Sequence, residues 1–413
     1  MDFIKERILE NVQVLLKNEK VLKAIEFIKE DDDRTLKEHL ELCEIPAPSH
    51  DEERRAIYVK NKFEEIGLDD IKIDEVWNVM GTIPGTGNGP VIMLAAHTDT
   101  VFPIETDLKV RKEGNVYYCP GINDDTRAVA ELFTIARAMK TFGIKAQGDI
   151  VFCANVCEEG LGDLKGVKHI FEYQNSIDAF VSIDNPVTGG IVYTATGSHR
   201  YQVTFSGCGG HSFADFGLPN PIHAMGRAIN MIAQFQVPKI PKTTFNVGIV
   251  EGGTSVNTIS ASCSMLVDIR SDSSEELNRL SLELKKAVDL AVQEENKRWE
   301  SSENVAAEII MKGNRPAGTQ PKDCTIVKTA WEAAELLGIE PELRDESSTD
   351  ANIPISMGIP AITVGRGGKE GKVHTIHEWF EPADAFLGPQ KDLLLILGLA
   401  GLDGCLEHRI KKL

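Results

Sequence analysis

Four short, mostly apolar runs constrain the fold of this chain more than any other feature. They are VIMLAAHTD (residues 91–99), DIVFCAN (149–155), DAFVSIDN (178–185) and PAITVG (360–365). Strands without polar alternation are buried on both faces, as in parallel sheets covered by helices. Helical patterns such as DDTRAVAELFTIARAMKTFG (124–143) and CTIVKTAWEAAELLG (324–338) accompany them. The sequence therefore predicts an α/β domain with a mostly parallel sheet and helices on both faces.

The middle of the chain follows a different pattern. In GSHRYQVTFSG (197–207), Tyr201, Val203 and Phe205 alternate with polar residues, which predicts a half-exposed strand. FNVGIVEGG and ISASCSMLVDIRSD are further strand candidates, and a long amphipathic helix follows them. We therefore expect a smaller α+β domain at 195–313, inserted between two parts of the first domain, 1–194 and 314–413.

Composition excludes some classes of partner. The 413 residues carry a formal net charge of −19, and no long basic run interrupts the acidity. A phosphate backbone would be repelled, so we expect no nucleic-acid partner. No run approaches the roughly 18 apolar residues of a membrane span, so we expect no membrane partner.

The first residues and the cysteines predict a cytoplasmic protein. The segment MDFIKERILENVQVLLKNEK lacks the features of a signal peptide. It predicts an amphipathic helix with Ile4, Ile8, Val12 and Leu15 on one face. The eight cysteines are dispersed, with no CxxC pair and no zinc-finger spacing. Free buried thiols are therefore favoured over disulfides.

Imidazoles and carboxylates follow the predicted strands, where an open parallel sheet binds its ligands. Each has an ordinary explanation by itself, because acids cap helices and polar residues open turns. Together they would repel one another unless a cation were present. The residues are His97 and Asp99 after the first strand, Glu158 and Glu159 after the second, Asp184 at the third, Asp124 and Asp125 at the start of a helix, and His374 and His377 in a late loop.

A pair of divalent cations would relieve this repulsion. Zinc accepts imidazole nitrogen and carboxylate oxygen, and one bridging carboxylate can serve two ions about 3.5–4 Å apart. Asp99 lies two residues after His97, so in an extended chain it points the same way and can support the imidazole. Glu158 and Glu159 face opposite ways in extended backbone, so one can bind metal while the other acts as a general base.

Six segments carry a resemblance to a known family: HTDTVFP, GINDDTRAVAEL, NVCEEG, SIDN, SGCGGHSF and VHTIHEW. They occur in the order found in the co-catalytic dinuclear zinc exopeptidases, which this sequence resembles from about Leu36 to the C-terminus. That family includes glutamate carboxypeptidase, peptidase T, carnosinase, acetylornithine deacetylase and succinyl-diaminopimelate desuccinylase.

The resemblance implies a role for each residue of this group. His97 and Asp184 would bind one zinc ion, and Glu159 and His374 the other. Asp124 would bridge the two ions and precede a cis peptide bond to Asp125. Asp99 would support the site, and Glu158 would be the general base. His374 is preferred to His377 because the pattern H-T-x-x-E runs from it to Glu378.

In the inserted domain the resemblance implies a lid that carries substrate contacts and forms a homodimer. His211 in GGHSF resembles a histidine that stabilises the oxyanion, and Asn257 resembles a substrate-contacting asparagine. Arg270 and Arg315 are candidates for binding a substrate carboxylate. The chain departs from the family pattern after the Asp pair, where Thr126, Arg127 and Ala128 replace the usual lysine and glycine-containing pair. This departure bears on substrate preference more than on metal binding.

The predicted function is hydrolysis of an amide bond in small peptides by a zinc-dependent exopeptidase. Each chain would hold two Zn²⁺, with Co²⁺ or Mn²⁺ as possible substitutes. Two alternatives stay open: an N-acyl amino acid deacylase, and a metal-binding homologue without activity. The glycine-rich segment GTIPGTGNGP precedes a strand, so it predicts a loop and not a phosphate-binding motif.

Overall fold

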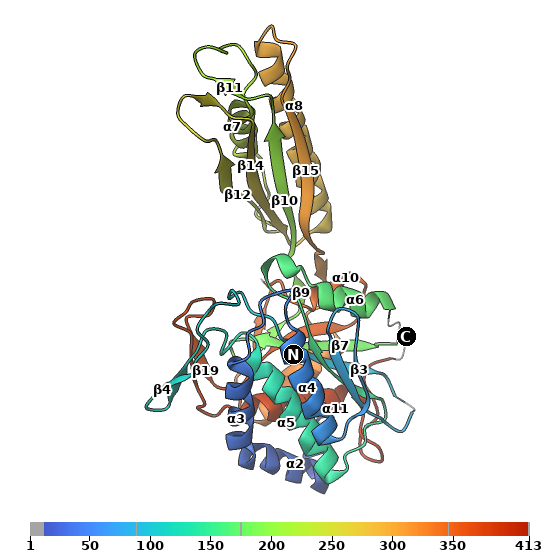
Figure 1. Ribbon diagram of the computed structural model, residues 1–413. Coiled ribbons are helices and arrows are strands. Elements are labelled where there is room, and N and C mark those ends of the chain that lie inside the picture. Colours follow the sequence, from blue (N-terminus) through green and yellow to red (C-terminus); the bar gives the residue numbers. More distant parts are fainter. Residues whose placement is uncertain (1–11, 88, 174–175, 346, 412–413) are drawn as a thin grey trace. The chain divides into compact units, whose positions relative to one another are not determined.

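The computed structural model describes residues 12–87, 89–173, 176–345 and 347–411. The chain divides into two compact units. Unit 1 comprises the described parts of Met1–Ala195 and Thr319–Leu413, and unit 2 is Thr196–Gly318 (Figure 1). The short strands β9 (Thr194–Ala195) and β16 (Gly318–Thr319) lie where the chain passes between the units.

Unit 1 is built on a mixed sheet of eight strands in the order β1-β2-β6-β3-β7-β18-β8-β17. The four central strands are the predicted apolar runs, and they are parallel to one another. The antiparallel pairings β1–β2, β2–β6 and β18–β8 lie outside this centre. The bounds are β1 Asp69–Ile73, β2 Val79–Ile83, β3 Ile92–His97, β6 Ile150–Asn155, β7 Ala179–Asn185, β8 Gly190–Val192, β17 Glu342–Arg344 and β18 Ala361–Gly365.

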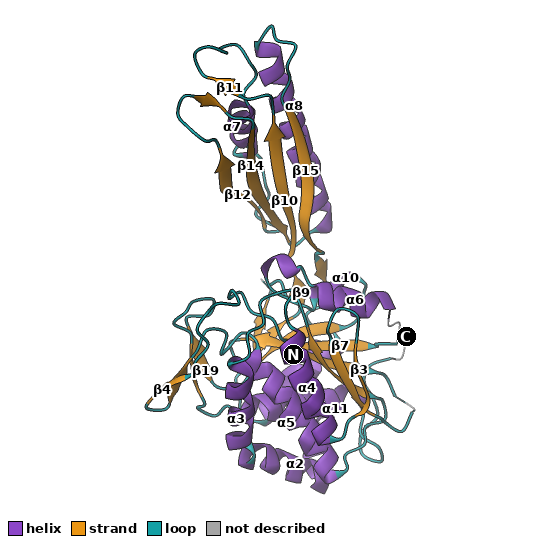
Figure 2. Cartoon of the chain, viewed as in Figure 1, coloured by secondary structure: helices purple, strands orange, loops and turns teal. Residues whose placement is uncertain are grey.

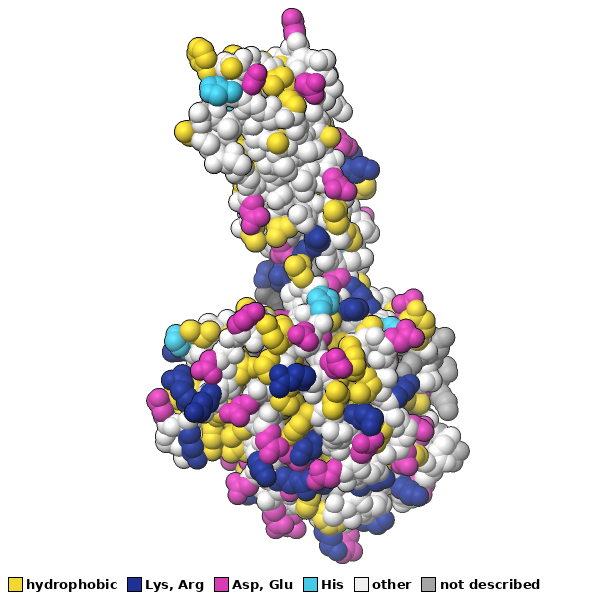
Figure 3. Space-filling model, viewed as in Figure 1, with side chains coloured by type: hydrophobic (Ala, Val, Ile, Leu, Met, Phe, Trp, Pro, Cys, Tyr) yellow, Lys and Arg dark blue, Asp and Glu magenta, His cyan; other side chains and the backbone are white. Residues whose placement is uncertain are grey.

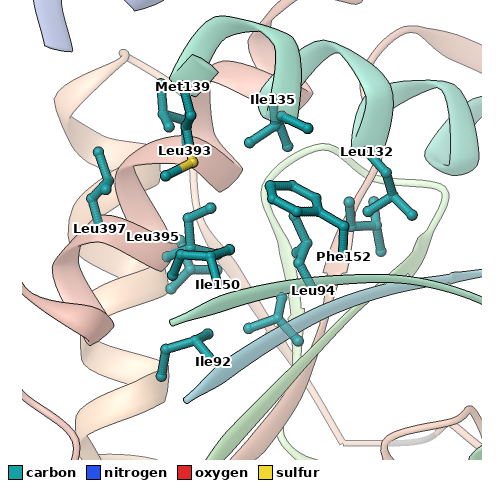
Figure 4. Close-up of a cluster of buried hydrophobic side chains, with 14 of the residues drawn as sticks. Ile92, Leu94, Leu132, Ile135, Met139, Ile150, Phe152, Leu393, Leu395 and Leu397 are labelled. Carbon is teal, nitrogen blue, oxygen red and sulfur yellow. The ribbon is translucent and has the colours of Figure 1, made fainter. Parts of the chain in front are cut away.

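Helices cover both faces of this sheet, as predicted (Figure 2). Alternate residues of β3 point to opposite faces, so Leu94 packs in one apolar cluster and Met93 in the other. The larger cluster, shown in Figure 4, packs α5 and α11 against β3 and β6. The smaller cluster includes residues of α6 and α10. The helices of unit 1 are η1 Val14–Lys17, α2 Glu19–Glu30, α3 Asp32–Cys43, α4 Glu53–Ile66, α5 Thr126–Phe142, η2 Gly160–Gly162, α6 Lys165–Tyr173, α9 Thr325–Leu336, α10 Asn352–Ser356 and α11 Leu387–Ala400.

A second, smaller sheet in unit 1 has the order β19-β20-β5-β4. Its strands are β4 Arg111–Glu113, β5 Val116–Tyr118, β19 Lys369–Gly371 and β20 Trp379–Glu381. The loop between β19 and β20 carries His374. On the face shown in Figure 3, acidic and basic side chains are interspersed over unit 1, with a small basic group over β4.

Unit 2 is an antiparallel sheet in the order β12-β14-β10-β15, with two helices packed on one face. Its core contains Tyr201, Val203 and Phe205, the alternating residues of the predicted strand. The predicted long helix is α8, and its apolar face is buried in the same core. The elements are β10 Gly197–Ser206, β11 Gly210–His211, α7 Pro221–Ile232, β12 Thr243–Gly252, β13 Thr258–Ile259, β14 Ser262–Ser271, α8 Ser274–Arg298 and β15 Ala306–Arg315.

Three smaller expectations concern the N-terminus, the cysteines and the membrane. Ile4 and Ile8 of the expected N-terminal helix lie outside the described residues, whereas Val12 and Leu15 are buried. All eight cysteines, each of them among the described residues, are free thiols. Among the helices that the structure describes, none combines the length and the apolar character needed to cross a membrane.

Candidate metal centre and active site

The site forms where the parallel strands of unit 1 end. In the register of β3 and β6, His97 lies opposite Asn155, so the residues that follow both strands emerge side by side. Asp184 is near the end of β7, which pairs with β3 on its other side. Asp124 and Asp125 precede α5, whose N-terminal end brings them to the same edge. These side chains therefore converge at the carboxyl ends of the parallel strands, where open parallel sheets bind their ligands.

His97 and Asp124 form the centre of the group. His97 is buried, and its Nε2 lies 2.9 Å from Asp124 Oδ1 and 4.0 Å from Asp184 Oδ1. The other oxygen of Asp124, Oδ2, lies 3.1 Å from His374 Nε2. That same Nε2 lies 2.7 Å from Glu159 Oε1. Asp124 therefore turns one oxygen to each histidine, which is the arrangement required of a bridging carboxylate.

The structure distinguishes His374 from His377. His374 contacts two carboxylates of the group, and its backbone N–H donates to Glu378 Oε1 over 2.7 Å. Both histidines are exposed, so the contacts of His374 and not burial distinguish the two. Glu378 is buried, and burial raises its pKa to about 8. The H-T-x-x-E pattern thus has a structural basis, because its glutamate holds the backbone of the histidine.

Asp99 connects the two strand ends. Its Oδ1 accepts the backbone N–H of Glu158 over 2.9 Å, and its Oδ2 accepts that of Glu159 over 3.0 Å. Oδ2 also accepts the hydroxyl of Ser49 over 2.6 Å, and Oδ1 lies 3.4 Å from His97 Nδ1. One buried carboxylate therefore holds the backbone of both glutamates and lies beside the imidazole. The Glu158 side chain is buried at this edge.

The charges of the group are strongly coupled. Burial lowers the pKa of His97, but contacts with Asp124 and Asp99 outweigh it and raise that pKa well above its ordinary value. Hydrogen bonds to Asp124 and Glu159 raise the pKa of His374 to about 10. Burial, followed by repulsion from Asp124, raises the pKa of Asp184 to about 7. The pKa of Asp124 is raised by burial but held well below its ordinary value by hydrogen bonds from His374 and His97. The histidines are thus serving as the positive partners of these carboxylates.

Two overlapping groups have the composition of a metal site. They are His97 with Asp125 and Asp184, and His97 with Asp124 and Glu159, each with ligand atoms that all lie within 4.8 Å of one another. Nitrogen and carboxylate oxygen donors in such groups suit zinc and similar divalent ions. Asp125 is the member that the sequence analysis did not assign. The peptide bond before it is cis, as the resemblance implied.

Asp125 has other partners than a metal ion. Its Oδ2 accepts the backbone N–H of His97 over 3.3 Å, and its Oδ1 accepts Arg366 NH1 over 3.1 Å. Asp125 therefore connects the backbone of His97 with the guanidinium of Arg366. The sequence analysis also did not assign Arg366. This residue directly follows β18, so its position at a strand end was a signal that could have identified it. A guanidinium carries only donors and does not bind metal ions, so a search for ligand types does not select Arg366.

The remaining predicted residues lie in unit 2. His211 Nδ1 accepts the backbone N–H groups of Phe213 (3.2 Å) and Ala214 (3.3 Å). In the neutral ring the proton therefore lies on Nε2, which makes that atom a donor. The backbone N–H of Ser212 donates to Asn257 O over 3.0 Å, so Asn257 lies beside the His211 strand.

The two predicted arginines lie on one face of the unit 2 sheet. Arg270 and Arg315 are both opposite Ser198 in the strand register, from the two neighbouring strands of β10. Directly opposed residues point to the same side of a sheet. Arg270 Nε donates to Asp268 over 2.8 Å, whereas Arg315 is buried.

Comparison with known proteins identifies the family. Residues 93–390 match the model of peptidase family M20/M25/M40, and the chain belongs to this family. The matched range contains every predicted site residue. Fold and site together define a hydrolase of the metallopeptidase class.

Three similar proteins illustrate the range of the family. The chain is 26% identical to the uncharacterized protein YqjE of Bacillus subtilis, over 84% of this chain and 92% of that protein. It is 24% identical to succinyl-diaminopimelate desuccinylase of Corynebacterium glutamicum, over 79% of this chain and 86% of the enzyme. The crystal structure of aminopeptidase PepT from Bacillus cereus aligns with a TM-score of 0.72 at 22% identity, over 88% of this chain and 97% of the other. The last similarity concerns the fold alone.

Proposed function

We propose that this protein is a dinuclear zinc exopeptidase that hydrolyses the amide bond of small peptides. The observation that carries the proposal is the position of Asp124, with one oxygen toward His97 and the other toward His374. His97 and Asp184 would bind one Zn²⁺, Glu159 and His374 the other, and Asp124 both. Co²⁺ and Mn²⁺ accept the same nitrogen and oxygen donors and are possible substitutes.

The proposed catalytic residues divide the steps of hydrolysis among them. Two bound divalent ions would polarise the scissile carbonyl and make a water molecule more acidic. Glu158 takes the proton from that water and delivers it to the leaving amine. Asp99 holds the backbone of Glu158 and Glu159, so that base and ligand keep a fixed spacing. His211 donates from Nε2 to the oxyanion that develops on the carbonyl.

Substrate contacts are proposed for unit 2, acting as a lid. Asn257 lies beside the His211 strand and would contact the substrate. Arg270 and Arg315 lie on one sheet face and would bind a substrate carboxylate, for which the guanidinium fork is suited. We also propose a homodimer formed through unit 2, and a cytoplasmic location, which the eight free cysteines favour.

The test is metal analysis combined with a substrate panel. The purified protein would be stripped with a chelator, reloaded with zinc, and assayed against dipeptides, tripeptides and N-acyl amino acids. We expect about two ions per chain and release of a terminal residue from a small peptide. A protein that retains no transition metal, or that hydrolyses none of the panel, would contradict the proposal.

A second candidate, an N-acyl amino acid deacylase, is favoured by the similarity to a desuccinylase over most of the chain. It uses the same residues and the same metal site. The panel separates the two, because a deacylase would cleave succinyl- or acetyl-amino acids and leave dipeptides intact. A homologue that binds metal without activity would leave the whole panel intact.

A further inference from the structure

Arg366 binds three carboxylates beside the proposed metal centre. Its side chain is buried, and its Nε and NH2 donate to the two oxygens of Glu370 over 2.7 and 2.9 Å. Its NH1 lies 3.1 Å from Asp125 Oδ1 and 3.4 Å from Asp184 Oδ1. Each of the three guanidinium nitrogens therefore donates to at least one carboxylate. Asp184 is one of the proposed ligands.

The backbone around Arg366 is held just as closely. Its own N–H donates to Asn185 O over 3.0 Å, which ties it to the end of β7. Lys391 Nζ donates to Gly365 O, and the N–H of Gly367 donates to Glu131 Oε1 over 2.8 Å. A Cβ on Gly365 would lie 1.8 Å from Val187 O, and one on Gly367 would lie 1.8 Å from Ala385 O. Only glycine fits on either side of the arginine.

These contacts account for ionic groups in the helical layer below the sheet. Glu131 of α5 and Lys391 of α11 are buried among apolar side chains. Arg127 Nε donates to Glu131 Oε1 over 2.9 Å, so the arginine that departs from the family pattern is the partner of that glutamate. Buried ion pairs are weak sources of stability compared with apolar residues of similar volume. The backbone contacts of Glu131 and Lys391 with Gly367 and Gly365 explain these buried charges better than a gain in stability does.

We propose that Arg366 is a positioning residue that orients Asp184 for metal binding and supports His97 through Asp125, and that Glu131 and Lys391 position Arg366. The inference rests on the proposed dinuclear site. Arg366 contacts Asp184 directly and reaches His97 through Asp125, which accepts the N–H of His97. These are the two proposed ligands that one ion does not share with the other, whereas Asp124 would be shared. Glu159 and His374, the ligands proposed for the other ion, make no contact with Arg366 among the hydrogen bonds described here. The effect of Arg366 should therefore fall on one ion.

The expected loss of metal affinity can be estimated from other residues that orient metal ligands without binding the metal. Loss of a group that orients a metal ligand commonly weakens metal affinity by about 10–100-fold. Lysine keeps the charge but has no planar fork, so it cannot bind Glu370 with two bonds and reach two aspartates as well. A positive charge alone is therefore insufficient to hold these carboxylates in place, and Arg366→Lys should also weaken the binding of one ion.

The test is titration of chelator-treated protein with Co²⁺, followed by visible absorption and by metal analysis after equilibrium dialysis. Wild type, Arg366→Met, Arg366→Lys and Glu370→Gln would be compared. The matched control is Arg409→Met, which removes another arginine with two bonds to a glutamate, Glu332, over 2.9 and 3.2 Å. We expect two ions in wild type and in the control. In the Arg366 variants we expect one ion of unchanged affinity and one weakened about 10–100-fold, with a smaller effect in Glu370→Gln.

The outcomes separate this inference from the proposed function. If wild type binds fewer than two Co²⁺, the dinuclear proposal fails. If wild type binds two and the Arg366 variants bind both with unchanged affinity, or lose both to the same extent, the positioning role is wrong. Circular dichroism checks folding. Should Arg366→Met not fold, Arg366→Lys and Glu370→Gln decide the question by the same criterion.

Discussion

Replacing Asp99 with asparagine tests the site at its most connected residue. The carboxylate accepts the N–H groups of Glu158 and Glu159 and the hydroxyl of Ser49, and it lies 3.4 Å from His97 Nδ1. Burial raises its pKa, but hydrogen bonding and attraction to His97, with help from Ser49 and the backbone, lower it overall. Asp99→Asn keeps the size of the side chain and exchanges one acceptor for a donor. No orientation of the amide satisfies all three donors.

The magnitude can be worked from these contacts. If the amide nitrogen replaces Oδ1, it faces the N–H of Glu158; if it replaces Oδ2, it faces Glu159 and Ser49. In the milder case one hydrogen bond to a charged group is lost, and the others become neutral. Such a loss costs about 1.5–3 kcal/mol, and a buried donor left without an acceptor costs about 1–3 kcal/mol. We expect the free energy of unfolding to fall by about 2.5–6 kcal/mol, and kcat/KM to fall about 10²-fold because base and ligand are displaced.

The assay is urea unfolding of the metal-free and metal-loaded protein, together with kcat and KM on the best substrate of the panel. Ser49→Ala is the control, since it removes one donor and leaves the carboxylate. Because the folded pKa of Asp99 is lowered, its contribution to stability is present above the unfolded pKa of about 3.9 and is lost as pH falls through the folded value. An Asp99→Asn protein with the unfolding midpoint and kcat/KM of Ser49→Ala would refute the reasoning.

Three further predictions concern the base, the ligands and the small sheet. Glu158→Gln should bind two ions as wild type does and lower kcat by about 10²–10⁴-fold; normal turnover would exclude it as the base. Metal uptake should release protons, and metal affinity should increase as pH rises through neutrality, because His374, with a pKa raised to about 10, must lose its proton to bind. Calorimetry in buffers of different ionisation enthalpy measures the number of protons released. Uptake without proton release would contradict this prediction. Gly371→Ala would place a Cβ 2.6–2.8 Å from the Trp379 indole and should lower the free energy of unfolding by about 1–3 kcal/mol in urea. Gly226→Ala, which meets open space inside α7, should instead raise it by about 0.5–1 kcal/mol.

The elements with strong periodic patterns were predictable from sequence. The central strands were recognised because burial on both faces leaves an uninterrupted apolar run, and α5 was ended correctly at Gly143, which has a φ of +58°. The strands β4, β5, β19 and β20 were not predicted, since three residues are too few to show an alternation. The antiparallel pairings beside the sheet centre were also missed. They depend on which strands meet in space, and burial patterns do not report direction.

The site was predictable to the extent that its residues are of metal-binding types. Histidine, aspartate and glutamate at strand ends indicate a metal site because their side chains bind metal ions. Arg366 occupies an equivalent position, but an arginine there does not indicate a metal site by itself. Yet the arrangement of the acids depends on it, because Asp125 and Asp184 are both buried or nearly so beside Asp124. A search of strand ends for counterions, and not only for ligands, would have found it.

Register is the part of the site that no pattern in this sequence contains. Asp99 reaches the N–H groups of Glu158 and Glu159 only because His97 lies opposite Asn155 in the pairing of β3 with β6. A slip of one residue would turn every side chain of the slipped strand to the other face of the sheet and separate these groups. Both strands are apolar up to their last residue, so burial would tolerate such a slip better than it would in an alternating strand. The polar contacts at the strand ends, including the N–H groups that Asp99 accepts, therefore select the register that the apolar runs leave open.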